Sequence, residues 1–213
     1  MIKGIIFDLD GTLLDTIKDI GNSVNAVMED NGLKTYSYDE YKLMVGNGFR
    51  KLLERALPED KQDLIEEAMH SFLYYYDKHY MESSLPYEGI RELLSELQKR
   101  QIKMAINTNK RNDYANNLIN HVLGDVDFIE VLGEKAEFPK KPSPEAALYL
   151  IDKMGLKKEE VLYIGDSSTD IKTALNAGLS SIGVNWGFRG EAELKREGAT
   201  YIAYQPSDIL KYL

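Results

Sequence analysis

The feature that most constrains this chain is a pair of aspartates, Asp8 and Asp10, within residues 7–16, FDLDGTLLDT. The preceding apolar run, residues 2–6, predicts a buried strand that ends at the two carboxylates. Side chains alternate along a strand, so both aspartates can point the same way, about 6–7 Å apart. Like charges this close repel unless a cation or a shared proton relieves them. Taken alone, the same string also fits a strand followed by a polar turn.

Composition narrows the class of protein. The 213 residues are 43% hydrophobic and 29% charged, as is ordinary for a globular chain of one large domain or one domain with an insert. The net charge of −9 argues against a nucleic-acid partner, and the absence of cysteine excludes disulfides and thiolate chemistry. No long apolar window or signal-type segment is present. We therefore expect a cytoplasmic protein with no membrane partner.

Residues 16–85 carry apolar side chains at helical spacing. The pattern predicts helices over 17–30, 37–45, 49–57 and 60–82, the second opened by a capping box from Ser37 to Glu40. No strand is predicted in this stretch. It is therefore expected to form a separate helical unit inserted after the first strand.

From residue 86 onward, strands and helices alternate. The predicted strands are 102–107, 127–133, 161–164, 180–184 and 200–203. The predicted helices are 89–100, 112–122, one opening at Ser143-Pro144, 168–177, 190–197 and 207–212. This alternation predicts a mainly parallel sheet with helices on both faces, and such sheets bind ligands beyond the carboxyl ends of their strands.

Polar segments stand where this architecture places a site. Residues 107–110, NTNK, follow the strand at 102–107, and residues 165–170, GDSSTD, follow the strand at 161–164. Residues 140–144, KKPSP, precede the helix that opens near 143. All three segments are therefore expected near the aspartates of the first strand.

Together with residues 7–16, these segments resemble the four ordered motifs of haloacid dehalogenase (HAD) superfamily phosphohydrolases, and residues 16–85 resemble a helical cap of the C1 type. The resemblance covers the whole chain. It implies a Rossmann-like α/β core domain, formed by residues 1–15 and 86–213, with an inserted all-helical cap domain formed by residues 16–85. It also implies a phosphatase that acts through an aspartyl-phosphate.

The resemblance assigns catalytic roles to four residues. Asp8 matches the nucleophile, and Asp10 matches the acid that protonates the leaving group and then activates water. Thr108 matches a hydroxyl that binds the phosphoryl group. Lys141 matches the lysine that neutralises the reacting oxygens, with Lys140 as an adjacent alternative.

The resemblance also implies a Mg²⁺ cofactor, which prefers a few carboxylates together with water and phosphate oxygens. Asp8, Asp166 and the main-chain carbonyl of Asp10 match the family's ligands. Asp170 lies four residues after Asp166 and matches the second acidic position, for which we expect an outer-shell or water-mediated role. An aspartate in the first helical turn would also complement the helix dipole without any metal.

Substrate selection is expected to involve Gly46, Asn47 and Arg50 in the cap, together with Asn109. The VGNG string at 45–48 and the NWGFRG string at 185–190 resemble the phosphoglycolate phosphatase branch, although Arg111 stands where that branch usually has Pro. Phosphoglycolate is thus the first substrate hypothesis, and pyrophosphate or a sugar phosphate also fits. The oligomeric state is left open between monomer and homodimer.

Three alternatives compete with a phosphatase. A phosphomutase of the β-phosphoglucomutase type shares the nucleophile, and an inorganic pyrophosphatase is the other enzyme alternative. A catalytically silent binding domain should have lost a catalytic group, yet Asp8, Asp10, Lys141 and Asp166 are all present. These residues favour an enzyme.

Overall fold

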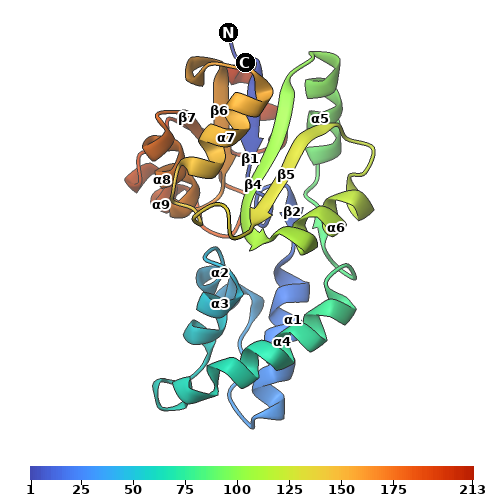
Figure 1. The fold of residues 1–213 in the computed structure, drawn as a ribbon, viewed down its shortest axis with the longest axis vertical. Coiled ribbons are helices and arrows are strands. Elements are labelled where there is room, and N and C mark those ends of the chain that lie inside the picture. Colours follow the sequence, from blue (N-terminus) through green and yellow to red (C-terminus); the bar gives the residue numbers. More distant parts are fainter.

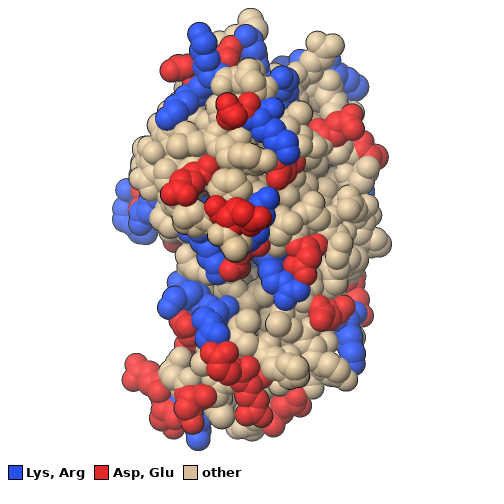
Figure 2. Space-filling view, in the orientation of Figure 1, with Lys and Arg blue, Asp and Glu red and all other residues tan.

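The computed structural model describes all residues 1–213, which form two lobes joined at a narrow waist (Figure 1). The space-filling view shows the same constriction between the lobes (Figure 2). The larger lobe contains the sheet, and the smaller lobe is helical. Both termini lie at the end of the larger lobe farthest from the helical one. None of the helices combines the length and the apolar character that crossing a bilayer requires.

The larger lobe is built on a six-stranded sheet in the order β5-β4-β1-β6-β7-β8, and every neighbouring pair is parallel. The strands are β1 (Gly4–Phe7), β4 (Lys103–Arg111), β5 (Phe128–Glu134), β6 (Val161–Gly165), β7 (Ser180–Val184) and β8 (Tyr201–Ala203). Strand β1 lies between β4 and β6, with Phe7 opposite both Ile106 and Ile164. From β1, the sheet therefore continues through β4 and β5 on one side and through β6, β7 and β8 on the other.

Helices cover both faces of the sheet, as the alternating pattern predicts. Ile5 and Phe7 pack on one face with α5 (Ile90–Lys99) and α6 (Asn112–Val122), whereas Ile6 packs on the other with α7 (Glu145–Met154) and α8 (Ser168–Ala177). These three β1 side chains are fully buried, and each contributes about 1.5–3 kcal/mol to stability. Burial on both faces explains why β1 is apolar throughout instead of alternating with polar residues.

The smaller lobe has its own hydrophobic core, formed by α1 (Ile17–Asp30), α2 (Tyr38–Met44), α3 (Phe49–Ala56) and α4 (Ile65–His79). The predicted capping box is present at the start of α2. Two aromatic residues from the larger lobe, Tyr114 and Phe188, join this cluster. The two lobes are thus held together partly by apolar packing.

The lobes are also tied where the chain passes between them. Strand β2 (Leu14–Asp15) pairs in antiparallel fashion with β3 (Leu85–Pro86), next to the boundaries proposed at 15/16 and 85/86. Asp19, in the first turn of α1, accepts hydrogen bonds from the Ser83 amide and the Ser84 hydroxyl. The returning segment is therefore anchored to α1, the helix that the outgoing segment leads into.

Four predicted elements differ in detail. The helix predicted over 60–82 is a 3₁₀ segment, Glu59–Leu64, followed by α4; the 3₁₀ segment buries no side chain, so nothing holds it in a regular α-helix. The strand predicted to end at residue 107 runs on to Arg111, because β5 pairs with it past a register shift. The final helix, Pro206–Tyr212, is also 3₁₀, and α9 (Glu191–Arg196) is shorter than predicted.

Candidate active site

The carboxyl ends of β1, β4 and β6 bring the predicted motifs together. Asp8 follows β1, Thr108 lies near the end of β4, and Asp166 follows β6. Because β1 lies between the other two strands, these residues meet at one edge of the sheet, where the strand order reverses. The amide of Asp8 also donates to the carbonyl of Ile164, which fixes its backbone beside β6.

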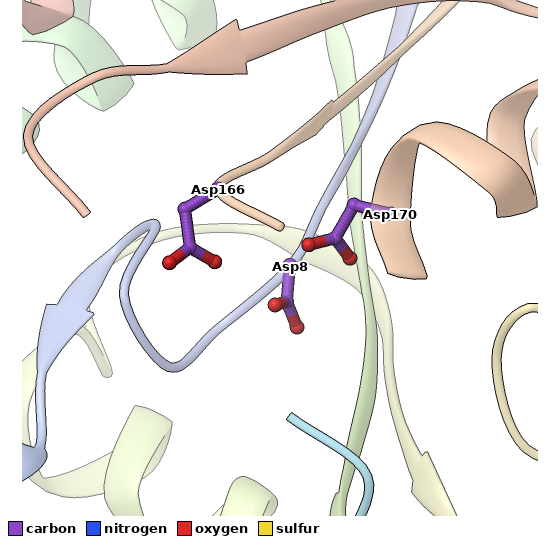
Figure 3. Close-up of side chains that lie close together, drawn as sticks. All are labelled: Asp8, Asp166 and Asp170. Atoms are coloured by element: carbon purple, nitrogen blue, oxygen red, sulfur yellow. The ribbon is translucent and has the colours of Figure 1, made fainter. Parts of the chain in front are cut away.

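Three carboxylates converge at this edge (Figure 3). One oxygen each from Asp8, Asp166 and Asp170 lie within 4.8 Å of one another, and all three residues are buried. Burial, followed by repulsion from Asp170, raises the pKa of Asp8 to about 7. The same two causes raise the pKa of Asp166 well above its usual range. The protein alone therefore leaves this cluster short of positive charge.

Lys141 is the cation nearest to the cluster. Its Nζ lies 2.7 Å from an oxygen of Asp8 and 2.7 Å from an oxygen of Asp170, and its side chain is 3% exposed. Burial opposes its charge, but the carboxylates of Asp170 and Asp8 hold the pKa of Lys141 above its usual value. Its neighbour Lys140 faces away and pairs with Glu134 at 2.7 Å.

A divalent cation fits this donor set. One ammonium group cannot balance three buried carboxylates, and hard oxygen ligands are those that Mg²⁺ prefers. Asp166 is held in place from one side, because its Oδ2 accepts the amide of Phe188 at 2.7 Å. Gly187 is required here, since a Cβ at this position would lie 2.3 Å from the Cβ of Asp166.

Asp170 is already engaged by the protein. Its Oδ1 accepts Lys141 Nζ at 2.7 Å, and its Oδ2 accepts the amide and hydroxyl of Ser167, which completes a capping box for α8. The side chain has no exposed surface. Asp170 thus both caps the start of α8 and orients Lys141. Its interaction with the helix dipole and a role near, but not on, a metal ion are therefore compatible.

Lys110 is a site residue that sequence reasoning missed. Its Nζ lies 2.9 Å from Oδ1 of Asp10, its side chain has no exposed surface, and the rings of Phe49 and Tyr76 lie 5.9 and 5.3 Å away. Burial would lower the pKa of Lys110, but Asp10 and Tyr76 raise it above its usual value. A signal existed, because residues two apart on an extended strand share a face, and β4 runs through both Thr108 and Lys110.

The neighbouring residues Thr108 and Asn109 contact different parts of the site. Thr108 is buried, and its hydroxyl accepts the amide of Lys110 at 3.2 Å. The amide group of Asn109 donates to the carbonyls of Gly46 and Lys141 and accepts the amide of Lys141. Asn109 therefore connects the helical lobe to the segment that positions Lys141.

A pocket lies between the lobes beside these residues. Its cavity volume, measured with a water-sized sphere, is about 50 Å³. Its lining is Asp10, Ile20, Val45, Gly46, Gly48, Phe49, Leu52, Thr108, Asn109, Lys110, Asp166, Ser167, Phe188 and Arg189.

Two residues expected to bind substrate, Asn47 and Arg50, are not part of this lining. The side chain of Asn47 accepts a hydrogen bond from Arg55. Arg50 pairs with Glu66 at 2.9 Å and is 47% exposed. For Arg50 the reason is helical geometry: consecutive residues of α3 are about 100° apart around the axis, and Phe49 takes the inward position.

Comparison with known proteins identifies the family. The model of the haloacid dehalogenase-like hydrolases matches residues 5–184. The chain belongs to this family. Its fold, with a parallel sheet and helices on both faces, is that of HAD hydrolases, which confirms the predicted fold class.

The relatives of this HAD hydrolase align with it over nearly its whole length. It is 33% identical to a phosphoglycolate phosphatase of Vibrio parahaemolyticus, which covers 99% of this chain and 95% of that protein. It is 34% identical to the enzyme of the same name from Aliivibrio fischeri, over 100% and 95%. A structure from Lactobacillus delbrueckii subsp. bulgaricus, described as a proposed phosphoglycolate phosphatase, superposes with a TM-score of 0.93 at 29% identity, over 99% and 97% of the two chains. The predicted enzyme class, a phosphoric monoester hydrolase, is confirmed.

Proposed function

We propose that this protein is a Mg²⁺-dependent phosphatase that acts on a small phosphorylated metabolite through an aspartyl-phosphate on Asp8. The observation that carries the proposal is the buried cluster of three carboxylates around one lysine, next to a pocket lined by Asp10 and Thr108. Such a cluster can accept a dianionic phosphoryl group only if positive charge accompanies it.

The first step forms a bond from a carboxylate oxygen of Asp8 to phosphorus as the ester P–O bond breaks. The leaving alkoxide takes a proton from Asp10. In the second step Asp10 removes a proton from water, whose oxygen attacks phosphorus and releases Asp8 and inorganic phosphate. One carboxyl group can serve as acid and then base because it lies near the nucleophile without being bonded to the substrate.

The remaining residues orient the reactants. Lys141 is held between Asp8 and Asp170, so its charge is available to both the nucleophile and the phosphoryl oxygens. The hydroxyl of Thr108 is free to donate to a phosphoryl oxygen. A bound Mg²⁺, held by Asp8, Asp166 and the main-chain carbonyl of Asp10, would supply positive charge against the phosphoryl group. Asp170 would orient Lys141 and the metal's surroundings.

The first candidate substrate is 2-phosphoglycolate. Its support is the name shared by relatives that match the chain from end to end, and the small pocket fits a short leaving group. Inorganic pyrophosphate and sugar phosphates are the comparison substrates.

The test is phosphate release from 2-phosphoglycolate, pyrophosphate and glucose phosphates, with Mg²⁺ and with chelator. We expect one preferred substrate, with turnover lost on chelation and lost in Asp8→Asn. Wild-type turnover by Asp8→Asn would refute the assignment of Asp8 as the nucleophile. Isomerisation of a sugar phosphate without net phosphate release would indicate a mutase instead.

A further inference from the structure

Arg189 occupies an unusual position between the two lobes. It follows β7, and its Nη2 donates to the carbonyls of Leu43 and Val45 in the helical lobe, each at 3.0 Å. These carbonyls belong to the last turn of α2 and the residue that caps it. Arg189 also lines the pocket, together with Asp10 and Thr108.

The charge of Arg189 is only weakly compensated by the protein. The one carboxylate within 4.0 Å is that of Glu193, whose oxygen lies 3.8 Å from Nε and accepts the amide of Ser168 at 2.9 Å. Nη1 makes no hydrogen bond within the protein. The other cation of the lining, Lys110, is already paired with Asp10. Arg189 is therefore the pocket cation that can still take an anion.

A second guanidinium strengthens the positive field at this end of the pocket. Arg55, on α3, donates to the carbonyl of Met44 and to the side chain of Asn47, and it has no carboxylate within 4.0 Å. Arg55 and Arg189 thus bind neighbouring carbonyls from opposite lobes. The lining also contains apolar side chains, among them Val45, Leu52 and Phe188.

We propose that Arg189 recognises a second anionic group on the substrate, a carboxylate on the leaving-group side of the phosphoryl group. The inference rests on the proposed phosphatase function and assigns its substrate class: phosphomonoesters of short hydroxy acids. A planar guanidinium binds a carboxylate through two parallel hydrogen bonds, and a partly desolvated site strengthens them. Because the same guanidinium holds α2, an anion bound there joins the substrate to the contact between the lobes.

The experiment compares kcat/KM for 2-phosphoglycolate with that for 2-hydroxyethyl phosphate, which has the same length and a neutral end. The wild type should prefer phosphoglycolate. Arg189→Gln keeps one donor for the carbonyls of α2 and should lower kcat/KM for phosphoglycolate by about 10- to 100-fold, with little change for 2-hydroxyethyl phosphate. The kcat/KM of Arg189→Lys for phosphoglycolate should lie between those of the wild type and Arg189→Gln. Inhibition by inorganic phosphate should be unchanged, because Arg189 binds the other end of the substrate.

The matched control is Arg91→Gln. Arg91 lies on α5, outside the pocket lining, and also donates to a main-chain carbonyl, that of Val122. It should leave both substrates unaffected. An equal loss on both substrates in Arg189→Gln would mean that Arg189 only supports the fold. Weaker inhibition by phosphate would mean that Arg189 acts on the phosphoryl end, and either result would overturn the inference. A wild type that hydrolyses both compounds equally well would overturn the inference and leave the phosphatase standing. Hydrolysis of neither would also overturn the inference, and the proposed phosphatase would fall with it only if pyrophosphate and the glucose phosphates released no phosphate either.

Discussion

Replacing the proposed nucleophile should make the metal-free protein more stable at alkaline pH. Asp8 is buried beside two other carboxylates, and its pKa of about 7 lies well above the ordinary value of 3.8. The ionised form is therefore less favourable in the folded protein than in the unfolded chain. Asp8→Asn removes this cost, because the amide has nearly the same shape and no charge.

The dependence on pH follows from the two pKa values. Between pH 4 and pH 7 the folded protein retains a proton on Asp8 that the unfolded chain has lost, so the free energy of unfolding falls as pH rises through this window. Above pH 7 the full cost is present. A difference of about 3 pH units corresponds to about 4 kcal/mol. This is the upper bound for the gain in Asp8→Asn, because Lys141 loses one of its two carboxylate partners in the same substitution.

The assay is thermal and urea unfolding of wild type and Asp8→Asn from pH 5 to pH 8.5, with chelator and with MgCl₂. In chelator the variant should gain up to several degrees in melting temperature at pH 8 and much less at pH 5. Magnesium at 100 times its dissociation constant should stabilise the wild type by about 2.7 kcal/mol and the variant by less.

Asp208→Asn is the control of opposite sign. Hydrogen bonds from Lys211, and then from the amides of Tyr204 and Gln205, lower the pKa of Asp208 to about 2. Its contribution is present above pH 4 and is lost as pH falls toward 2, so this variant should be less stable at pH 5 and pH 8 alike. A metal-free wild type whose stability is flat or rises from pH 5 to pH 8, or an Asp8→Asn variant that is no more stable at pH 8, would refute the reasoning.

Four further substitutions test other parts of the structure. Lys141→Met should lower kcat by about 100- to 1,000-fold, measured as phosphate release with saturating Mg²⁺, and a smaller effect would exclude its electrostatic role. Lys110→Met leaves Asp10 without its buried partner and should cost about 3 kcal/mol in urea unfolding, whereas an unchanged midpoint would contradict the pairing. Gly48→Ala forces a backbone at φ 85° and ψ 168°, which should cost about 1–3 kcal/mol by the same measurement and reduce kcat/KM; full activity with full stability would argue against this constraint. Asp19→Ala removes the acceptor of the Ser83 amide and the Ser84 hydroxyl and should cost about 1–3 kcal/mol, with faster proteolysis in the segment that returns from the helical lobe; unchanged cleavage would show that these hydrogen bonds do not anchor that segment.

Much of the architecture could be predicted from local patterns. An apolar run such as β1 requires a strand that is buried on both faces. The helical spacing over 17–30 places the apolar side chains on one face of a helix, which must then pack against other elements. Each motif also stands immediately after a strand or before a helix, so a parallel sheet brings Asp8, Thr108 and Asp166 to one edge whatever the details of packing.

The limits appear where packing decides between similar local choices. Residues 59–64 have helical composition, yet they bury no side chain and form a 3₁₀ segment. Lys140 and Lys141 are adjacent in sequence, and only tertiary contacts, with Asp170 on α8 and with Asn109 on β4, decide that Lys141 contacts Asp8 while Lys140 faces Glu134.

The sequence by itself determined the parallel α/β core, the helical insertion and the four polar segments, because strand and helix periodicity and motif order are local properties of the chain. The tertiary structure alone decided which cations face the pocket. Asp10 and Lys110 are separated by 100 residues, and Arg189 reaches carbonyls more than 140 residues away, whereas Arg50 is turned toward Glu66. Such pairings depend on how the helical lobe packs against the sheet, and no local pattern in the sequence encodes contacts between residues so far apart along the chain.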